Sequence, residues 1–293
     1  MKACVILNPI AGSAKEADEI RKQIDEVLAP SVVFVTHGAG DAAVFAEQAI
    51  GSGCDYIIAA GGDGTLNEVV NGVAEHAANI RVGLLPLGTG NDFARSLNLP
   101  ATVGENIAIL SVANTRRIDL IRVRSDQVRY FVNVSAGGFS GLVNEKLTPE
   151  LKRTWGPLAY VRSAAAALPE MHAYRTEVQL GEGESLALDL YNVIVANGRF
   201  VAGGLPVAPE ADPGDGLLDV ILIPKRSTAE MVLLAAQIVL GNHLRSESIL
   251  FRRTSQLSVT SQPGMWFNAD GELVGNEPAT FEIIPGALQF VIP

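Results

Sequence analysis

The chain has few of the residues that mark a secreted disulfide framework or a nucleic-acid-binding protein. Its 293 residues include only two cysteines, Cys4 and Cys54, and both fall in apolar runs. Buried free thiols in a reducing compartment are therefore expected. Positive charge is also scarce, since 22 lysines and arginines against 32 acidic residues give a net charge of −10. That balance disfavours nucleic acid as a partner, because nucleic-acid-binding domains usually present a basic surface.

Long apolar runs are absent as well. The apolar start Ala3–Leu7 ends at Asn8 and Pro9, which is too early for the core of a secretory signal. The nearest approach to a membrane span, Met231–Leu240, is short and interrupted by Gln237. We therefore expect a cytoplasmic protein without a transmembrane segment.

The overall composition is that of a folded protein long enough for two domains. Apolar residues make up 48% of the chain and charged residues 18%, with no low-complexity linker and no internal repeat. The chain can therefore bury a sizeable core.

The first 120 residues alternate between predicted strands and helices. The strands are apolar without alternation, which is typical of a mostly parallel sheet covered on both faces. The predicted strands are Ala3–Leu7, Val32–Val35, Tyr56–Ala60 and Val82–Leu85, and the helices are Lys15–Leu28, Asp41–Ile50, Leu66–Ala74 and Val103–Val112.

The pattern changes after about Arg117. Short strands with period-two alternation follow, separated by Gly, Pro, Asp and Asn, and they predict an antiparallel β-sandwich. Two helical segments interrupt them, roughly Lys146–Leu168 and Thr228–Leu240. The expected domains are an α/β domain at 1–120 and a sandwich at 121–293, and the last residues are left free to rejoin the first domain.

A glycine-rich loop lies between the predicted strand Tyr56–Ala60 and the next helix. Gly61, Gly62 and Gly64 would let backbone amides approach a ligand, and the helix N-terminus favours an anion. Asp63 would repel phosphate unless a cation lies between them, a role that the Mg²⁺ of MgATP would fill. The alternative is a tight turn that only caps the helix.

Two more loops of small and polar residues follow strands of the same sheet, at 8–13 and 86–93. Because the ends of neighbouring parallel strands meet at one edge of a sheet, the three loops are expected to converge on one nucleotide. Ordinary turns and helix caps are the alternative. The predicted nucleotide-binding residues are Asn8, Pro9, Gly12, Thr36, Gly61, Gly62, Asp63, Gly64, Thr65, Asn67, Glu68, Gly88, Thr89, Asn91 and Asp92.

These loops carry a family resemblance. GGDGTLNEVVNG at 61–72, followed by PLGTGNDFAR at 86–95, resembles the catalytic domain of the diacylglycerol kinase family in its soluble bacterial lipid-kinase branch. GGDGT alone is shared with NAD kinases, whereas the extension and the second motif narrow the match to lipid kinases. The resemblance implies an α/β domain, a C-terminal β-sandwich and a site in the cleft between them.

The second half of the chain is similar to the same family. Pro209 to Asp219 resembles a loop that, by this resemblance, binds a structural Mg²⁺ through Asp215 and main-chain oxygens near Asp212 and Leu217. An ordinary Asp–Gly turn is the alternative. The family has three glycines where this chain has Ala202-Gly203-Gly204, so a slightly different loop is expected there.

The family's DGE motif is matched at 270–272. A lipid hydroxyl is a poor nucleophile, so a nearby carboxylate must accept its proton as the bond to phosphorus forms. By resemblance this base is Glu272, with Asp270 in support and Asp63 as the third catalytic residue. A hairpin turn with an exposed glutamate is the alternative.

The resemblance therefore implies an ATP- and Mg²⁺-dependent lipid kinase, with diacylglycerol as the first acceptor to consider. A sphingoid base, phosphatidylglycerol, an NAD kinase activity and a non-catalytic nucleotide-binding regulator remain open, as does a homodimer. A lipid acceptor requires transient contact with a membrane surface. The segment with Lys146, Lys152, Arg153, Trp155 and Arg162 suits such contact, although a helix packed on the sandwich fits it equally.

Overall fold

The computed structural model describes residues 2–11, 14–30, 32–139, 158–167, 170–276 and 278–293. Gly12 lies outside these residues, as do Lys146, Lys152, Arg153 and Trp155 of the predicted interfacial segment. The described end of that segment is helix α8 (Leu158–Ala167).

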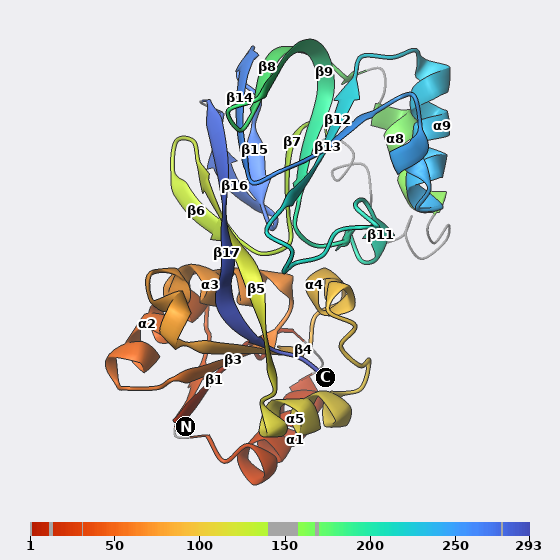
Figure 1. Cartoon of the computed structure of the whole chain (residues 1–293). Coiled ribbons are helices and arrows are strands. Elements are labelled where there is room, and N and C mark those ends of the chain that lie inside the picture. Colours follow the sequence, from red (N-terminus) through yellow and green to blue (C-terminus); the bar gives the residue numbers. More distant parts are fainter. Residues whose placement is uncertain (1, 12–13, 31, 140–157, 168–169, 277) are drawn as a thin grey trace.

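The N-terminal part is a parallel sheet with helices on both faces, as the apolar strands predicted (Figure 1). Its strands run in the order β4–β3–β1–β2, with bounds Arg81–Pro86, Tyr56–Gly61, Ala3–Leu7 and Val32–Val35. The long helices are α1 (Ala14–Val27), α2 (Asp41–Gly51), α3 (Asp63–Val73) and α5 (Val103–Val112), and the turn η1 (Ala74–Asn79) follows α3.

Successive residues of β1 show why apolar and polar residues do not alternate along these strands. Cys4 and Ile6 pack in the cluster that contains α2 and α3, whereas Val5 and Leu7 pack in the cluster that contains α1 and α5. Because both faces are covered, every position in the strand is apolar. Both cysteines are buried and free, as expected.

The C-terminal part consists of antiparallel strands. The ladder β15–β7–β9–β8–β14 comprises Phe267–Ala269, Val134–Gly138, Glu184–Ala196, Tyr174–Leu180 and Gln256–Gln262, and β16 (Glu272–Gly275) pairs with β15 at its edge. Strand β12 (Leu218–Pro224) joins β9 and β13 (Leu250–Thr254), and a short hairpin forms from β10 (Phe200–Val201) and β11 (Leu205–Pro206).

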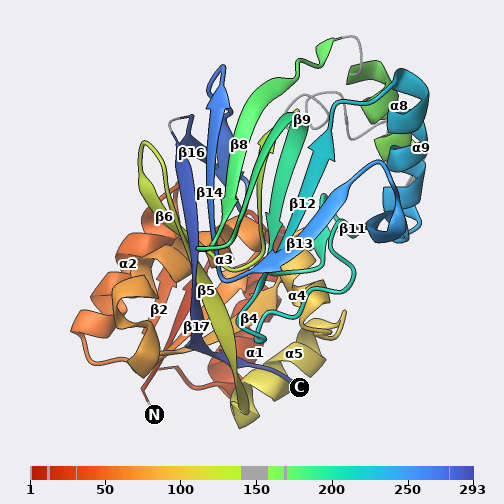
Figure 2. The same ribbon diagram turned by 45° about the horizontal axis from the view of Figure 1, so that its top comes forward.

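Two helices cover one side of this part. Figures 1 and 2 show α8 and α9 (Thr228–Val239) side by side, next to β12 and β13, and the turn η3 (His243–Arg245) follows α9. They pack over one face of the sheet, while Phe131, Phe267 and Phe281 fill the core on its other face. The fold class predicted from the sequence, an α/β domain with a β-sandwich, is confirmed.

Two long strands connect the parts. Strand β5 (Thr115–Arg124) pairs with β6 (Val128–Phe131) and along most of β17 (Ala279–Val291). The end of β17 then adds to the parallel sheet, where Gln289 and Phe290 pair with β4. A boundary at residue 120 stays a prediction, because both strands pass continuously from one part to the other. Among the described helices, none has the length and apolarity needed to cross a membrane.

Candidate active site

The first glycine loop lies at the carboxyl end of β3. Gly61 is the last residue of the strand, Gly62 precedes the helix in an extended conformation, and α3 begins at Asp63. The helix thus starts three residues before the predicted Leu66, so Asp63, Gly64 and Thr65 form its first turn. The N-cap residue, Gly62, has no side chain with which to cap this N-terminus, so the backbone amides are available to an anion.

The second glycine loop packs directly against the first. A Cβ on Gly88 would come within 2.6 Å of the Gly62 Cα, so both positions require glycine. Asn91 then holds the loop in shape: its side chain accepts from the Gly88 N–H at 3.0 Å and donates to the Gly88 carbonyl at 2.7 Å. The left-handed backbone of Asn91, with φ of +51°, is one that asparagine tolerates better than most residues.

Asp63 connects the two loops. One carboxylate oxygen accepts the backbone N–H of Phe93 at 3.2 Å, at the start of the short helix α4 (Asp92–Ser96). A Cβ on Gly90 would lie 3.0 Å from the other oxygen of Asp63 and 3.6 Å from an oxygen of Asp92. Both aspartates therefore lie close to Gly90.

The first strand adds Asn8 to the same edge. Its side chain donates to the Thr65 hydroxyl at 3.2 Å and accepts from the Ile10 N–H at 3.0 Å. Thr36 follows β2 directly and is buried, and its N–H donates a hydrogen bond to the Leu7 carbonyl at 2.9 Å. The structure therefore brings the ends of all four parallel strands together, as the sequence predicted.

Asp92 joins the N-terminal part to the glycine-rich hairpin β10–β11. It is 7% exposed, and its two oxygens accept the N–H groups of Gly203 and Gly204 at 2.9 and 2.7 Å. Burial raises the pKa of this carboxyl, and the charge of Asp63 raises it further. Asp92 thus holds the edge of the sandwich against the second loop.

Asp270 is the carboxylate that the sandwich contributes. It lies in the turn between β15 and β16 and accepts the N–H groups of Val132, Asn133 and Val134 at 3.2, 3.2 and 2.9 Å. Burial raises the pKa of Asp270 to about 6 despite these bonds and a hydrogen bond from Asn67, and the charge of Asp63 also raises it. Asp270 therefore lies where the sandwich meets the N-terminal part, bonded to Asn67 and near enough to Asp63 for that charge to act on it.

Glu272 begins β16, two residues beyond Asp270. Its side chain is exposed and forms no hydrogen bond or ion pair with a described residue. A free carboxylate beside the cleft is compatible with a proton acceptor, and the assignment of the base to Glu272 stays a prediction.

Glu68 has a different role from the one predicted. Its two carboxylate oxygens accept the N–H groups of Gly40 and Ala42 at 2.9 and 3.0 Å, at the start of α2. Because both oxygens cap that helix, the geometry does not support nucleotide binding by Glu68. Asn67 is 3% exposed and bonds Asp270, so it links α3 to the sandwich.

The loop predicted to hold a structural Mg²⁺ is bound by arginines. Arg116 pairs with Asp212, and Arg253 pairs with both Asp215 and the buried Asp219. The other oxygen of Asp215 accepts the N–H of Leu217 at 3.0 Å. Among the described residues no group of three or more His, Cys, Asp or Glu could hold a metal. The predicted site uses one carboxylate, Asp215, with main-chain oxygens near Asp212 and Leu217, and it stays a prediction.

Two features near the cleft were missed in the sequence. Phe200 lies between the guanidiniums of Arg95 and Arg199, which are 5.9 and 5.5 Å from its ring centroid. Asp119, 1% exposed in β5, accepts the N–H groups of Gly216 and Gly286 at 2.8 and 2.7 Å. Arg95 closes the PLGTGNDFAR motif and was within reach of sequence reasoning, whereas Asp119 lies in an ordinary strand pattern.

Glycine loops at parallel strand ends, with carboxylates converging from a sandwich, define a phosphotransferase class of site. Residues 2–123 match the model of the diacylglycerol kinase catalytic domain, and residues 133–292 match the YegS C-terminal NAD kinase beta sandwich-like domain. The chain belongs to the diacylglycerol kinase catalytic-domain family.

Named relatives match the chain over nearly its full length. A diacylglycerol kinase of Staphylococcus haemolyticus is 32% identical over 292 residues, covering 96% of this chain and 86% of that enzyme. One of Staphylococcus epidermidis is 31% identical over 299 residues, covering 100% and 92%.

Solved structures share the fold. A diacylglycerol kinase from Bacillus anthracis superposes with a TM-score of 0.77 at 20% identity, covering 100% of this chain and 97% of the other. An NAD kinase from Archaeoglobus fulgidus in complex with ATP gives 0.52 at 16% identity, covering 99% and 93%.

Proposed function

We propose that the protein transfers the γ-phosphate of MgATP to the hydroxyl of a lipid, with diacylglycerol as the acceptor. The single observation that supports this most is the position of Asp63. It connects both glycine loops and lies close enough to Asp270 of the sandwich to raise the pKa of that carboxyl. Donor and acceptor chemistry would then meet in one cleft.

The N-terminal loops would bind the donor. The uncapped N-terminus of α3 offers backbone N–H groups to the phosphates, and the absence of side chains at Gly62 and Gly88 lets a ligand approach the backbone. Asp63 and Asp92 would repel bare phosphate, so the donor is bound as its Mg²⁺ complex. Orientation and charge neutralisation are the main contributions that a protein makes to phosphoryl transfer.

The sandwich would activate the acceptor. The lipid hydroxyl attacks the γ-phosphorus, the bond from that phosphorus to ADP breaks, and the hydroxyl proton passes to the Glu272 carboxylate. Asp270, held by three backbone amides, would fix the turn that carries Glu272 and add negative charge beside it. The proton then leaves to solvent as the lipid phosphate departs.

Diacylglycerol is preferred over other lipids because the named relatives above 30% identity carry that acceptor in their description. The only support for an NAD kinase activity is the shared fold and the GGDGT motif. The DGE turn favours a lipid as the acceptor.

The test is an acceptor panel with γ-labelled ATP and Mg²⁺. It contains diacylglycerol, a sphingoid base, phosphatidylglycerol and NAD, and the product is separated by extraction into organic solvent. Labelled phosphatidate from diacylglycerol is the expected result. Label transferred to NAD alone would overturn the proposal, and binding of ATP without transfer to any acceptor would favour a regulator instead.

A further inference from the structure

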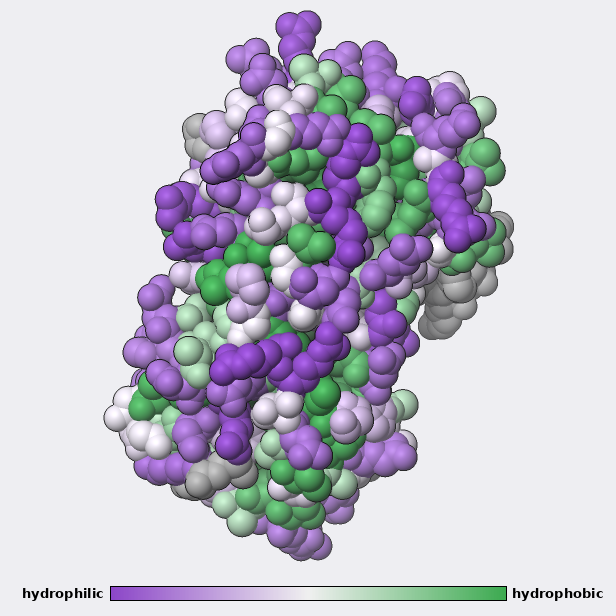
Figure 3. Space-filling model, viewed as in Figure 1, coloured by the Kyte–Doolittle hydropathy of each residue, from purple (hydrophilic) through white to green (hydrophobic). Residues whose placement is uncertain are grey.

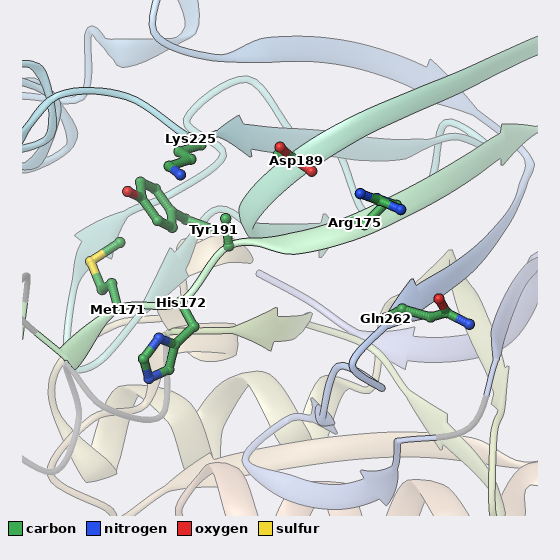
Figure 4. A pocket seen from close by; sticks show the side chains of 8 residues that line it. Met171, His172, Arg175, Asp189, Tyr191, Lys225 and Gln262 are labelled. Atoms are coloured by element: carbon green, nitrogen blue, oxygen red, sulfur yellow. The ribbon is translucent and has the colours of Figure 1, made fainter.

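A polar hollow lies in the C-terminal part, away from the glycine loops. It has a volume of about 530 Å³ and is bounded by β8, β9, the end of β12 and the end of β14 (Figure 4). Its polar lining comes from His172, Arg175, Asp189, Tyr191, Lys225 and Gln262. Nothing in the proposed transfer reaction uses these residues.

Two cations of this hollow have no partner among the described residues. Lys225 and Arg175 are exposed, and neither side chain makes an ion pair or hydrogen bond with a described residue. Both side chains are therefore available to an external anion.

The charges are unevenly distributed within the hollow. Asp189 faces Arg175 in the β8–β9 register and offsets part of its charge. Figure 4 shows Lys225, Tyr191 and His172 at one end, and Arg175 and Gln262 at the other. An ammonium, a phenol and an imidazole together form a donor set suited to phosphate, while the second end suits the polar remainder of a headgroup.

Exposed apolar side chains follow residues of the hollow closely in the chain at two places. Trp266 is 53% exposed and ends the turn that begins at Gln262, and Leu273 on the neighbouring strand is 62% exposed. Helix α9 begins three residues after Lys225 and exposes Leu233 at 58%. Figure 3 shows hydrophobic side chains at the edge of the molecule over this helix. Cations beside tryptophan and leucine are typical of surfaces that contact the headgroup layer of a bilayer.

Trp266 is also close to the proposed acceptor site. Trp266 precedes Asp270 by four residues along β15, which at the rise of a strand is about 13 Å. A bilayer in contact with Trp266 would therefore present its lipids within a molecular length of the cleft.

We propose that this hollow binds the phosphate group of an anionic phospholipid and so orients the protein on the membrane that supplies its acceptor. The inference rests on the proposed function only in that the acceptor is a membrane lipid. Lys225 is the main phosphate contact.

The test measures binding to vesicles of phosphatidylcholine with and without phosphatidylglycerol, by cosedimentation without ATP. Lys225→Gln is expected to weaken binding to the anionic vesicles roughly fivefold, the usual effect of one cation near such a surface. Lys22→Gln is the matched control, because Lys22 is equally a surface lysine but lies on α1 in the N-terminal part. Equal binding by both variants would overturn the proposal.

Competition with inorganic phosphate distinguishes a site for a lipid headgroup from a site for the free phosphate ion. At matched ionic strength phosphate should not displace the wild-type protein from anionic vesicles, because the bilayer supplies apolar contacts as well. Complete displacement would show a site for free phosphate and contradict membrane docking.

A further assay distinguishes failure of the proposed kinase function from failure of the membrane-binding proposal. A short-chain, water-soluble diacylglycerol is expected to be phosphorylated equally by wild type and Lys225→Gln, whereas diacylglycerol in anionic vesicles is phosphorylated more slowly by the variant. No transfer by wild type to either form would refute the kinase assignment and leave the vesicle-binding result to decide this inference.

Discussion

Replacing Asp270 by asparagine should remove a pH-dependent cost to stability and lower the activity. The pKa of Asp270 is raised from 3.8 to about 6, so the folded protein holds this proton more tightly than the unfolded chain does. Ionisation therefore costs about 3 kcal/mol of stability, which is absent below pH 3.8 and fully felt once the pH has risen past about 6. Asparagine carries no charge and avoids that cost.

The backbone should accept the change. Asp270 has a φ of +47°, a conformation that asparagine adopts more readily than most residues. The amide offers one acceptor oxygen where the carboxyl offers two, so its NH2 group would face a backbone N–H such as that of Val132 and leave that donor unpaired, at a cost of about 1–3 kcal/mol at any pH. The variant should therefore melt below wild type near pH 4, and its Tm relative to wild type should rise by about 5–10 °C between pH 4 and pH 8.

The assay is thermal denaturation at pH 4 and pH 8, with phosphoryl transfer measured at pH 8. We expect this rise in relative Tm between pH 4 and pH 8, together with a fall in turnover of at least about 100-fold. A variant with normal turnover would remove Asp270 from the site. A Tm difference from wild type that is the same at both pH values would refute the reasoning from burial.

The remaining predictions concern the N-terminal loops and the aspartate loop. Asp63→Asn should abolish phosphoryl transfer, because the arrangement of metal and phosphate is lost; unchanged transfer would remove Asp63 from the site. Glu68→Gln is its control, expected to lower Tm through the weakened α2 cap while transfer persists. Gly88→Ala should weaken ATP binding in calorimetry at least tenfold, since a Cβ there meets the Gly62 Cα, and normal affinity would contradict the close packing of the loops. Chelation with EDTA without nucleotide should leave Tm within about 1 °C if arginines hold the Asp212–Asp219 loop, whereas a large drop would restore the predicted Mg²⁺.

The sequence predicted the fold well because its strongest signals are local. Strands such as Tyr56–Ala60 are short apolar runs that end in glycine, and the helix Val103–Val112 is found in the structure with the predicted bounds. The convergence of Asn8, Asp63 and Asn91 also followed from strand order in a parallel sheet.

The remainder depends on contacts between distant residues. Glu68 adjoins the phosphate loop in sequence, and only the packing of α3 on α2 reveals that it caps a helix. The backbone N–H groups that bind Asp270 belong to Val132 to Val134, well over a hundred residues away. The raised pKa of Asp270 therefore has no signal in the neighbouring sequence. The pairing of Arg116 and Arg253 with the aspartate loop is equally non-local, which is why that loop resembled a cation site.

The central claim is that ATP is bound by the glycine loops while the sandwich acts on the acceptor, and Glu272→Gln tests it most directly. Its side chain is exposed and unpaired among the described residues, so the fold should be unaffected. Calorimetry with MgATP and steady-state transfer to diacylglycerol are measured on the same protein. We predict an ATP Kd within about threefold of wild type and a kcat at least about 100-fold lower. Loss of ATP binding in a folded variant, or an unchanged kcat, would contradict the division of roles between the two parts of the chain.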